Sequence, residues 1–204
     1  MAAELGEAIA AEHWGLVYGG GGIGLMGEVA RGALAAGGHV TGVIPHRLAT
    51  REIALDGVTE LIRTDTMRER KGIMDARSDG FIVLPGGIGT LEELLEIITL
   101  RQLGYHERPI VLLDPRGFWE PLVTQLDRIV AEGLAQPQLR ELWAWVDTVP
   151  DAIETVRREL VLPHVAEGDL AAADGAPGQA REAAEGAPAE DLEVIEAPPQ
   201  EASG

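Results

Sequence analysis

The sequence predicts an α/β protein in which helices pack on both faces of a parallel β-sheet. Short apolar runs alternate along the chain with stretches whose apolar residues recur at helical spacing. Several of these runs are apolar at nearly every position, which is typical of strands covered on both faces. In such folds, ligands bind beyond the carboxyl ends of the strands.

The first half of the chain supplies the beginning of this alternation. The sequence opens on a helical pattern, residues 1–14. A β-prone run, GLVYGG (15–20), ends in glycines and precedes a helical stretch at 24–36. HVTGVIP (39–45) is a second strand, which its final proline closes, and a loop is expected through Arg51.

The second half continues the same order up to residue 162. VTELIRT is a short strand, and GFIVLP and RPIVLLD are almost wholly apolar strands. Amphipathic stretches separate them and are expected to be the crossover helices. The expected strands are 58–64, 80–85, 108–114 and 142–147, and the expected helices are 66–77, 90–103, 119–131 and 150–160.

The start of the chain departs from the usual pattern. Doubly wound folds normally begin with a strand that lies centrally in the sheet, and here a helical pattern comes first. A missing central strand would leave backbone groups of its neighbours unpaired. We therefore expect either a fold that lacks this strand or a sequence that starts too late and is poorly active.

Residues 163–204 differ from the rest in composition. They hold 10 Asp or Glu, one Arg, 12 Ala, 5 Pro and 5 Gly, with few branched aliphatic residues. Such a segment buries too little apolar surface to offset its conformational entropy. The sequence thus predicts a folded α/β domain over residues 1–162 and a disordered acidic tail over residues 163–204. The tail is either a solvated appendage or a regulatory arm.

Composition excludes several classes of protein. The net charge of −18 argues against a nucleic-acid partner, which needs a basic face. No apolar run reaches the roughly 18 residues of a membrane span, so no membrane association is expected. The absence of cysteine excludes disulfides and thiolate chemistry, and no signal peptide is recognisable, which predicts a cytoplasmic protein. The histidines lack metal-ligand spacing, so no metal is expected.

A first glycine-rich turn, YGGGGIGLMGE (18–28), follows a strand and opens a helix. It satisfies G-x-G-x-x-G, but the next strand ends in VIPHR, without the acid that would hold a ribose in a dinucleotide site. An NAD-dependent dehydrogenase is therefore disfavoured. Two interpretations remain: the glycines let backbone N–H groups approach a phosphate at the helix N-terminus, or they only make a tight turn.

A second glycine-rich turn begins LPGGIGTLEELLEII, residues 84–98. Thr90 and Glu93 have the spacing of a capping box and could simply start a helix. Alternatively, the glycines bare the backbone at the end of a strand, and a carboxylate beside them could hold sugar hydroxyls or orient water.

The segment MRERK (67–71) carries two adjacent basic residues. At helical spacing Met67, Arg70, Lys71 and Met74 share one face. Lys71 is the only lysine in the chain. Exposed surface charges are one interpretation. A buried-face arginine suited to bidentate phosphate contact is the other.

Together, the motifs GGGGIGLMG, GVIP, RE at 51–52, MRERK and PGGIGTLEE resemble the LOG (Lonely Guy) family over roughly residues 5–135. Members of this family are cytokinin riboside 5′-monophosphate phosphoribohydrolases, often mislabelled lysine decarboxylases. The resemblance implies a Rossmann-like parallel sheet, a homodimer, and hydrolysis of the bond between an adenine-type base and ribose 5′-phosphate. It implies no cofactor.

The resemblance also implies the site residues. Arg70 and Glu93 match the family's catalytic arginine and glutamate. The matching substrate-binding positions are Gly20, Gly21, Gly22, Met67, Lys71, Gly86, Gly87, Gly89 and Thr90. Whether the base is adenine or an N6-prenylated adenine stays open.

Two alternatives stand beside the nucleotide hydrolase. A non-catalytic nucleotide- or cofactor-binding protein of Rossmann type would need the pocket but no chemistry. A lysine decarboxylase would need pyridoxal phosphate on a lysine, for which Lys71 is the sole candidate, and no cofactor-binding signature accompanies it.

Overall fold

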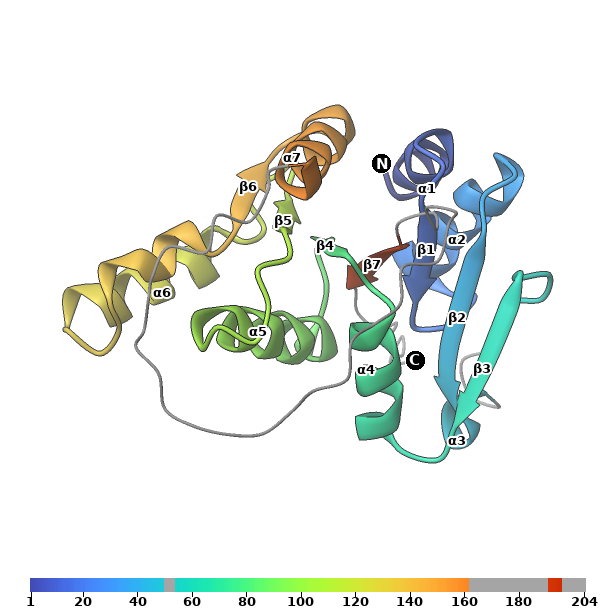
Figure 1. Ribbon diagram of the computed structural model, residues 1–204, viewed down its shortest axis with the longest axis horizontal. Helices are drawn as coiled ribbons and strands as arrows, with labels where there is room; N and C mark the ends of the chain where they lie inside the picture. Colours follow the sequence, from blue (N-terminus) through green and yellow to red (C-terminus); the bar gives the residue numbers. More distant parts are fainter. Residues whose placement is uncertain (50–53, 162–190, 196–204) are drawn as a thin grey trace, which may run out of the picture.

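The computed structural model describes residues 1–49, 54–161 and the backbone of 191–195. In these residues, seven strands form one parallel sheet in the order β3-β2-β1-β7-β4-β5-β6 (Figure 1). The chain runs outward from β1 to β3, crosses back over the sheet through α4, and runs outward again from β4 to β6. The predicted α/β fold with a parallel sheet is confirmed.

The bounds of the elements agree closely with the alternation in the sequence. The strands are β1 (Gly15–Tyr18), β2 (Val40–Pro45), β3 (Glu60–Thr64), β4 (Gly80–Val83), β5 (Ile110–Leu113), β6 (Ala144–Val146) and β7 (Asp191–Ile195). The α-helices are α1 (Ala2–Ala11), α2 (Gly24–Ala35), α3 (His46–Ala49), α4 (Met67–Ala76), α5 (Ile88–Gln102), α6 (Glu120–Ala131) and α7 (Val149–Val161), and a 3₁₀ helix, η1, spans Pro137–Glu141. None of these helices is long and apolar enough to cross a membrane.

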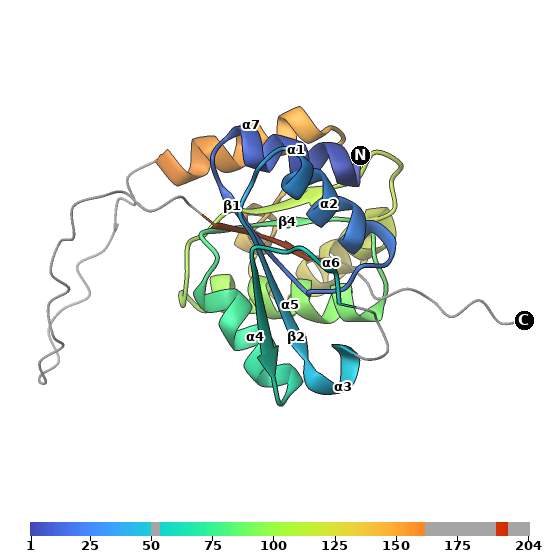
Figure 2. The same ribbon diagram turned by 90° about the vertical axis from the view of Figure 1, so that its right-hand side faces the viewer.

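Helices cover both faces of the sheet, as predicted (Figure 2). Along β4, alternate side chains point to opposite faces, which sorts the core into layers. Ile82 packs with α1, α2 and α7 on one face. Phe81 and Val83 pack with α5 and α6 on the other face, where α4 covers the part of the sheet around Val17. The strands β1, β2, β4 and β5 are buried at every position, which explains why their sequences are largely apolar.

The centre of the sheet is occupied by a strand from the far end of the chain. β7 pairs in parallel with β1, Leu16 opposite Leu192, and with β4, Ile82 opposite Val194. A helix, α1, precedes β1, but the expected unpaired edges on β1 and β4 are not found, because β7 lies between them (Figure 1). The expectation of disorder is wrong for residues 191–195, where the two neighbouring strands offer a backbone ladder on each side.

The rest of the expected acidic tail, within 162–190 and 196–204, lies outside the described residues. A division of the chain at residue 162 stays a prediction. Within the domain, the loop expected after Pro45 begins with the short helix α3. The helix expected from Thr90 starts two residues earlier, at Ile88, and its N-cap is Gly87.

Candidate active site

Helix α4 crosses between the two halves of the sheet and carries the basic pair. Thr66 is its N-cap, and the hydroxyl oxygen of Thr66 accepts a hydrogen bond from the backbone N–H of Glu69 at 3.1 Å. The carboxylate of Glu69 accepts one in return from the backbone N–H of Asp65 at 2.9 Å. These reciprocal bonds fix where the helix starts and therefore which side chains face the sheet.

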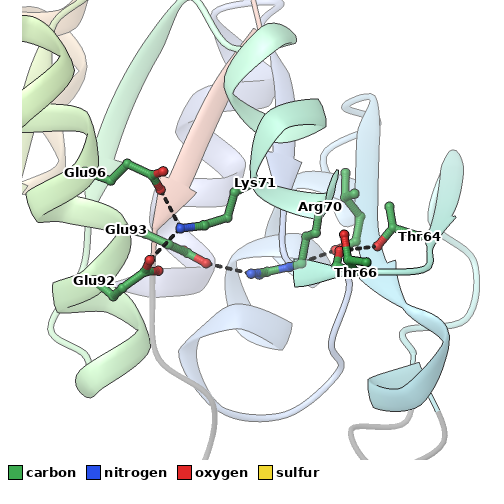
Figure 3. Close-up of polar contacts among 8 residues, drawn as sticks. Thr64, Thr66, Arg70, Lys71, Glu92, Glu93 and Glu96 are labelled. Carbon is green, nitrogen blue, oxygen red and sulfur yellow. Dashed lines mark hydrogen bonds and ion pairs between the residues drawn. The ribbon is translucent and has the colours of Figure 1, made fainter. Parts of the chain in front are cut away.

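Arg70 faces the sheet and is nearly buried. Its Nε donates to the backbone oxygen of Val43 in β2 at 3.1 Å. Its Nη1 donates to Oε1 of Glu93 at 2.6 Å (Figure 3). Of the two interpretations of the basic pair, the buried arginine is thus correct for Arg70.

Glu93 does not cap its helix. The N-cap of α5 is Gly87, without a side-chain cap bond, and the carboxylate of Glu93 is directed to the guanidinium of Arg70 instead (Figure 3). The capping-box interpretation of Thr90 and Glu93 is therefore wrong. A charged partner on α4 replaces the local bond, since hydrogen bonds between charged groups are stronger than those between neutral groups.

The ion pair joins α4 to α5 in a poorly hydrated place. The Arg70 and Glu93 side chains are only 10% and 9% exposed. Burial raises the pKa of Glu93 above its ordinary value, and the positive charge of Arg70, with its hydrogen bond, opposes that rise. The result is a carboxylate that one guanidinium keeps charged in surroundings that favour the neutral acid.

Lys71, next along α4, points to a different pair of carboxylates. Its Nζ lies 2.5 Å from Glu92 and 2.7 Å from Glu96, both on α5 (Figure 3). Partial burial lowers the pKa of Lys71, but the hydrogen bonds to the two glutamates outweigh it and the pKa is raised. A lysine held protonated in this way is poorly suited to form a Schiff base, which requires the neutral amine.

The first glycine-rich turn leads from β1 into α2. Gly20 has φ 80°, in the left-handed region, and its carbonyl accepts a hydrogen bond from the backbone N–H of Leu55 at 3.1 Å. Gly21 pairs with Ala54 in an isolated bridge, and the carbonyl of Gly22 accepts from Arg31 at 3.0 Å. Carbonyls of this turn are thus used within the protein.

The second turn leads from β4 into α5. Gly86 and Gly87 precede the helix, and Gly89 and Thr90 lie in its first turn, where N–H groups have no partner within the helix. Thr90 is fully buried, and its hydroxyl has no hydrogen-bond partner among the described residues. A buried hydroxyl without a partner costs free energy unless a ligand or water supplies one.

The predicted stripe on α4 divides in two. Arg70 and Met74 are buried, whereas Met67 is 45% exposed and Lys71 half-buried. Met67 lines a pocket of about 640 Å³ at the carboxyl ends of β2 and β3, together with Pro45 and Leu48. Of these three residues, only Met67 lies on the helix of the arginine, one turn before it.

Two further predictions concern other groups. Both residues of the RE motif, Arg51 and Glu52, lie outside the described residues. Among the residues that the structure does describe, no cluster of three or more His, Asp or Glu could hold a metal ion.

The structure brings Arg70 and Glu93 into contact, and each of the two glycine-rich turns leads from a strand into a helix. The turns follow β1 and β4, the strands on either side of β7, and α4 crosses between the halves of the sheet beside them. Such an arrangement defines a Rossmann-like protein, a class in which ligands bind beyond the carboxyl ends of the strands.

Comparison with known proteins identifies the family. The model of the family described as "Possible lysine decarboxylase" matches residues 26–156, and the chain belongs to this family. A cytokinin riboside 5′-monophosphate phosphoribohydrolase of Mycobacterium tuberculosis is 50% identical over 153 residues, 75% of this chain and 82% of that protein. One of the same name from Arabidopsis thaliana is 44% identical over 77% of this chain and 72% of the relative. The resemblance to the LOG family is confirmed.

A solved structure supports the fold. The molybdenum cofactor carrier protein of Chlamydomonas reinhardtii superposes with a TM-score of 0.61 at 29% identity, over 79% of this chain and 87% of the other. The shared architecture thus extends to a protein whose name describes carrying rather than reaction, which makes the chemistry of the site decisive.

Proposed function

We propose that this protein hydrolyses the N-glycosidic bond of a purine nucleoside 5′-monophosphate, of adenosine or cytokinin type, and releases the free base and ribose 5-phosphate. Relatives at 41–50% identity carry the name of this activity. The observation that carries the proposal is the buried ion pair between Arg70 and Glu93 at the carboxyl edge of the sheet.

The chemistry needs a negative charge beside the ribose. As the bond from C1′ to the base breaks, positive charge develops on the ribose ring. In this proposal Glu93 stabilises this charge and orients the attacking water. The water's oxygen forms a bond to C1′ as the bond to the base breaks, and the proton that the water loses goes to the base, which leaves as the neutral purine. Arg70 keeps Glu93 ionised and has further N–H groups with which to fix the nucleotide.

The two glycine-rich turns are the proposed cradle of the 5′-phosphate. Backbone N–H groups at the start of α5, beside Gly86, Gly87 and Gly89, favour an anion, and the helix dipole adds to this preference. The unpartnered hydroxyl of Thr90 supports the same assignment, because a phosphate oxygen would supply its missing acceptor.

Gly20, Gly21 and Gly22 form the proposed opposite wall of the pocket. Met67, with its apolar neighbours Pro45 and Leu48, is proposed to contact the base. Lys71 is proposed to act at the margin of the site, beside the carboxylates that it binds.

A substitution at Glu93 tests the proposal. We expect Glu93→Ala to lower the kcat of base release from AMP and from isopentenyl-AMP by about 1,000-fold or more, because a positioned acid–base group contributes roughly 10²–10⁴-fold. Binding of the nucleotide, followed by titration calorimetry, should survive. Glu92→Ala, which removes the neighbouring exposed carboxylate, is the matched control, and equal activity of both variants would refute the role of Glu93.

A carrier of nucleotide or cofactor is the second candidate, favoured by the likeness to the molybdenum cofactor carrier protein. A carrier needs no acid–base group beside the ribose, whereas hydrolysis does. The buried ion pair of Arg70 with Glu93 therefore supports the hydrolase. Chromatography after incubation with AMP separates the two, since a carrier returns the nucleotide intact. A decarboxylase is disfavoured by the raised pKa of Lys71.

A homodimer is the proposed assembly. Large apolar side chains on α5 and just beyond it are exposed, namely Ile88, Leu95 and Leu103. A second copy of the chain would cover such a surface. Sedimentation velocity tests this, and a monomer at micromolar concentration would contradict it. A nucleotide substrate and a cysteine-free chain support a cytoplasmic location.

A further inference from the structure

Gly19, the first residue after β1, lies against the guanidinium of Arg70. A Cβ atom at this position would be 2.2 Å from Nη2 of Arg70 and 3.3 Å from its Cζ. It would also be 3.0 Å from Sδ of Met26, which is itself buried. The first of these distances is far below van der Waals contact, so Arg70 occupies the space that any other residue at 19 would need.

The backbone does not explain a glycine here. Gly20, the next residue, has φ 80° and is a position where glycine is favoured. Gly19 is not among the residues with positive φ. An alanine at 19 would therefore meet a spatial conflict with Arg70 and no conformational penalty from its own φ angle.

The guanidinium cannot move away without losing a partner. Nε is bound to the carbonyl of Val43 and Nη1 to Glu93, at 3.1 and 2.6 Å. The side chain is 10% exposed, so little free volume surrounds it. Displacing Nη2 by enough to admit a methyl group would stretch one of these two hydrogen bonds.

The rest of the fold can accept the methyl group. All three atoms that it meets belong to the far ends of two flexible side chains, Arg70 and Met26. At Gly27, in contrast, a Cβ would lie 2.2 Å from the backbone oxygen of Gly22. Substitution at 27 would force a helix away from the turn, whereas substitution at 19 would be absorbed by the arginine.

We propose that Gly19 is a positioning residue for this site: its missing side chain makes the space in which Arg70 meets Glu93. The inference rests on the proposed hydrolysis for its effect on rate. A shift of about 1 Å in a catalytic group costs roughly 100-fold in rate, so we expect Gly19→Ala to lower kcat for base release from AMP by about that factor.

Gly72→Ala is the matched control. Gly72 lies on α4, the helix of Arg70, and a Cβ there has open space around it. We expect this variant to keep the wild-type kcat and to unfold at the same or a higher temperature, because alanine favours a helix. Gly19→Ala should unfold within a few degrees of wild type yet be slow, and a Gly19→Ala variant as active as Gly72→Ala would overturn the inference.

A double-mutant cycle separates positioning from a general packing defect. Arg70→Lys removes Nη2, the atom that the methyl group displaces. If Gly19 acts through Arg70, Gly19→Ala should reduce kcat/KM by less than about 3-fold in the Arg70→Lys background. An undiminished loss of about 100-fold in that background would refute action through Arg70.

A crystal structure of Gly19→Ala gives a readout independent of activity. We expect the distance from Nη1 of Arg70 to Oε1 of Glu93, now 2.6 Å, to lengthen or the bond to Val43 to break. Both contacts unchanged would overturn the inference. If the wild type releases no base from either nucleotide, the proposed function fails, and the crystal structure still decides the role of Gly19.

Discussion

Glu93 is the residue whose charge state should set the acid side of the activity profile. Burial raises its pKa, and Arg70 limits the rise. The ionised carboxylate is the form that stabilises positive charge on the ribose, so activity should be lost as the pH falls through this pKa. The loss should therefore occur at a higher pH than for an ordinary glutamate.

A pH profile of kcat/KM measures this directly. We expect its acidic limb to have a midpoint above 4.5, the ordinary value of the carboxyl group. Arg70→Lys should not lower that midpoint, because a shorter side chain cannot keep the same contact with Glu93. A wild-type limb at or below 4.5 would contradict a raised pKa at the reacting carboxylate.

Thr90 allows stability and binding to be separated at a single residue. Thr90→Val keeps the shape of the side chain and removes a buried hydroxyl that has no partner among the described residues. We expect the nucleotide-free protein to be unchanged or about 1 kcal/mol more stable to urea. We expect KM for AMP to rise about 10-fold, since a hydrogen bond to a charged phosphate is lost. An unchanged KM would argue against phosphate contact by Thr90.

For individual residues, the sequence indicated candidates for the site but not the contacts between them. Arg70 and Glu93 were expected in the site, yet they come from different helices 23 residues apart, and no spacing rule indicates that they pair. Gly19 was missed because it stands in a run of four glycines, in which sequence alone cannot separate the residue that makes the turn from the one that makes space. The contact with Arg70 separates them.

Among the elements, α4 and α5 are joined by Lys71 as well as by the ion pair. Lys71 reaches two carboxylates on α5 that are about half exposed, so each interaction contributes modestly. We expect Lys71→Met to reduce the free energy of unfolding by about 1 kcal/mol and Lys71→Arg to restore most of it.

The kinetics of Lys71→Met distinguish the roles considered for this lysine. If Lys71 mainly joins the helices, kcat should fall less than 10-fold and KM should stay within about 3-fold of wild type. A large rise in KM would instead indicate direct contact with the nucleotide. Complete loss of activity in both Lys71→Met and Lys71→Arg would contradict the bridging role.

Most element bounds could be predicted from apolar runs and their glycine or proline ends. The start of α5 could not, because Thr90 and Glu93 have the spacing of a local cap while the charged partner of Glu93 lies on another helix. A tertiary contact therefore decides a local boundary. The short helix α3 was also missed, since four residues show no periodicity.

For the whole molecule, the decisive feature is β7 at the centre of the sheet. The average composition of residues 163–204 predicted disorder and concealed a five-residue run, DLEVI, that pairs on both sides. A truncation after residue 190 should reduce the free energy of unfolding by about 3 kcal/mol or more, because buried groups on β1 and β4 lose partners at roughly 1 kcal/mol each. A truncation after residue 195 keeps β7 and should have little effect.

Urea unfolding and base release report on both truncated chains. Loss of β7 should reduce activity together with stability, because β1 and β4 lead directly into the two glycine-rich turns. Equal stability of the two truncated proteins would show that β7 does not hold the halves of the sheet together.

The position of β7 has a consequence for how the protein is made. During synthesis, β1 and β4 leave the ribosome long before Asp191–Ile195. Their edges that pair with β7 therefore stay unpaired until that segment has been made. Contacts between segments so distant in sequence form slowly, and exposed strand edges invite association with other chains in the meantime. The nascent chain should consequently depend on chaperones until β7 has been added.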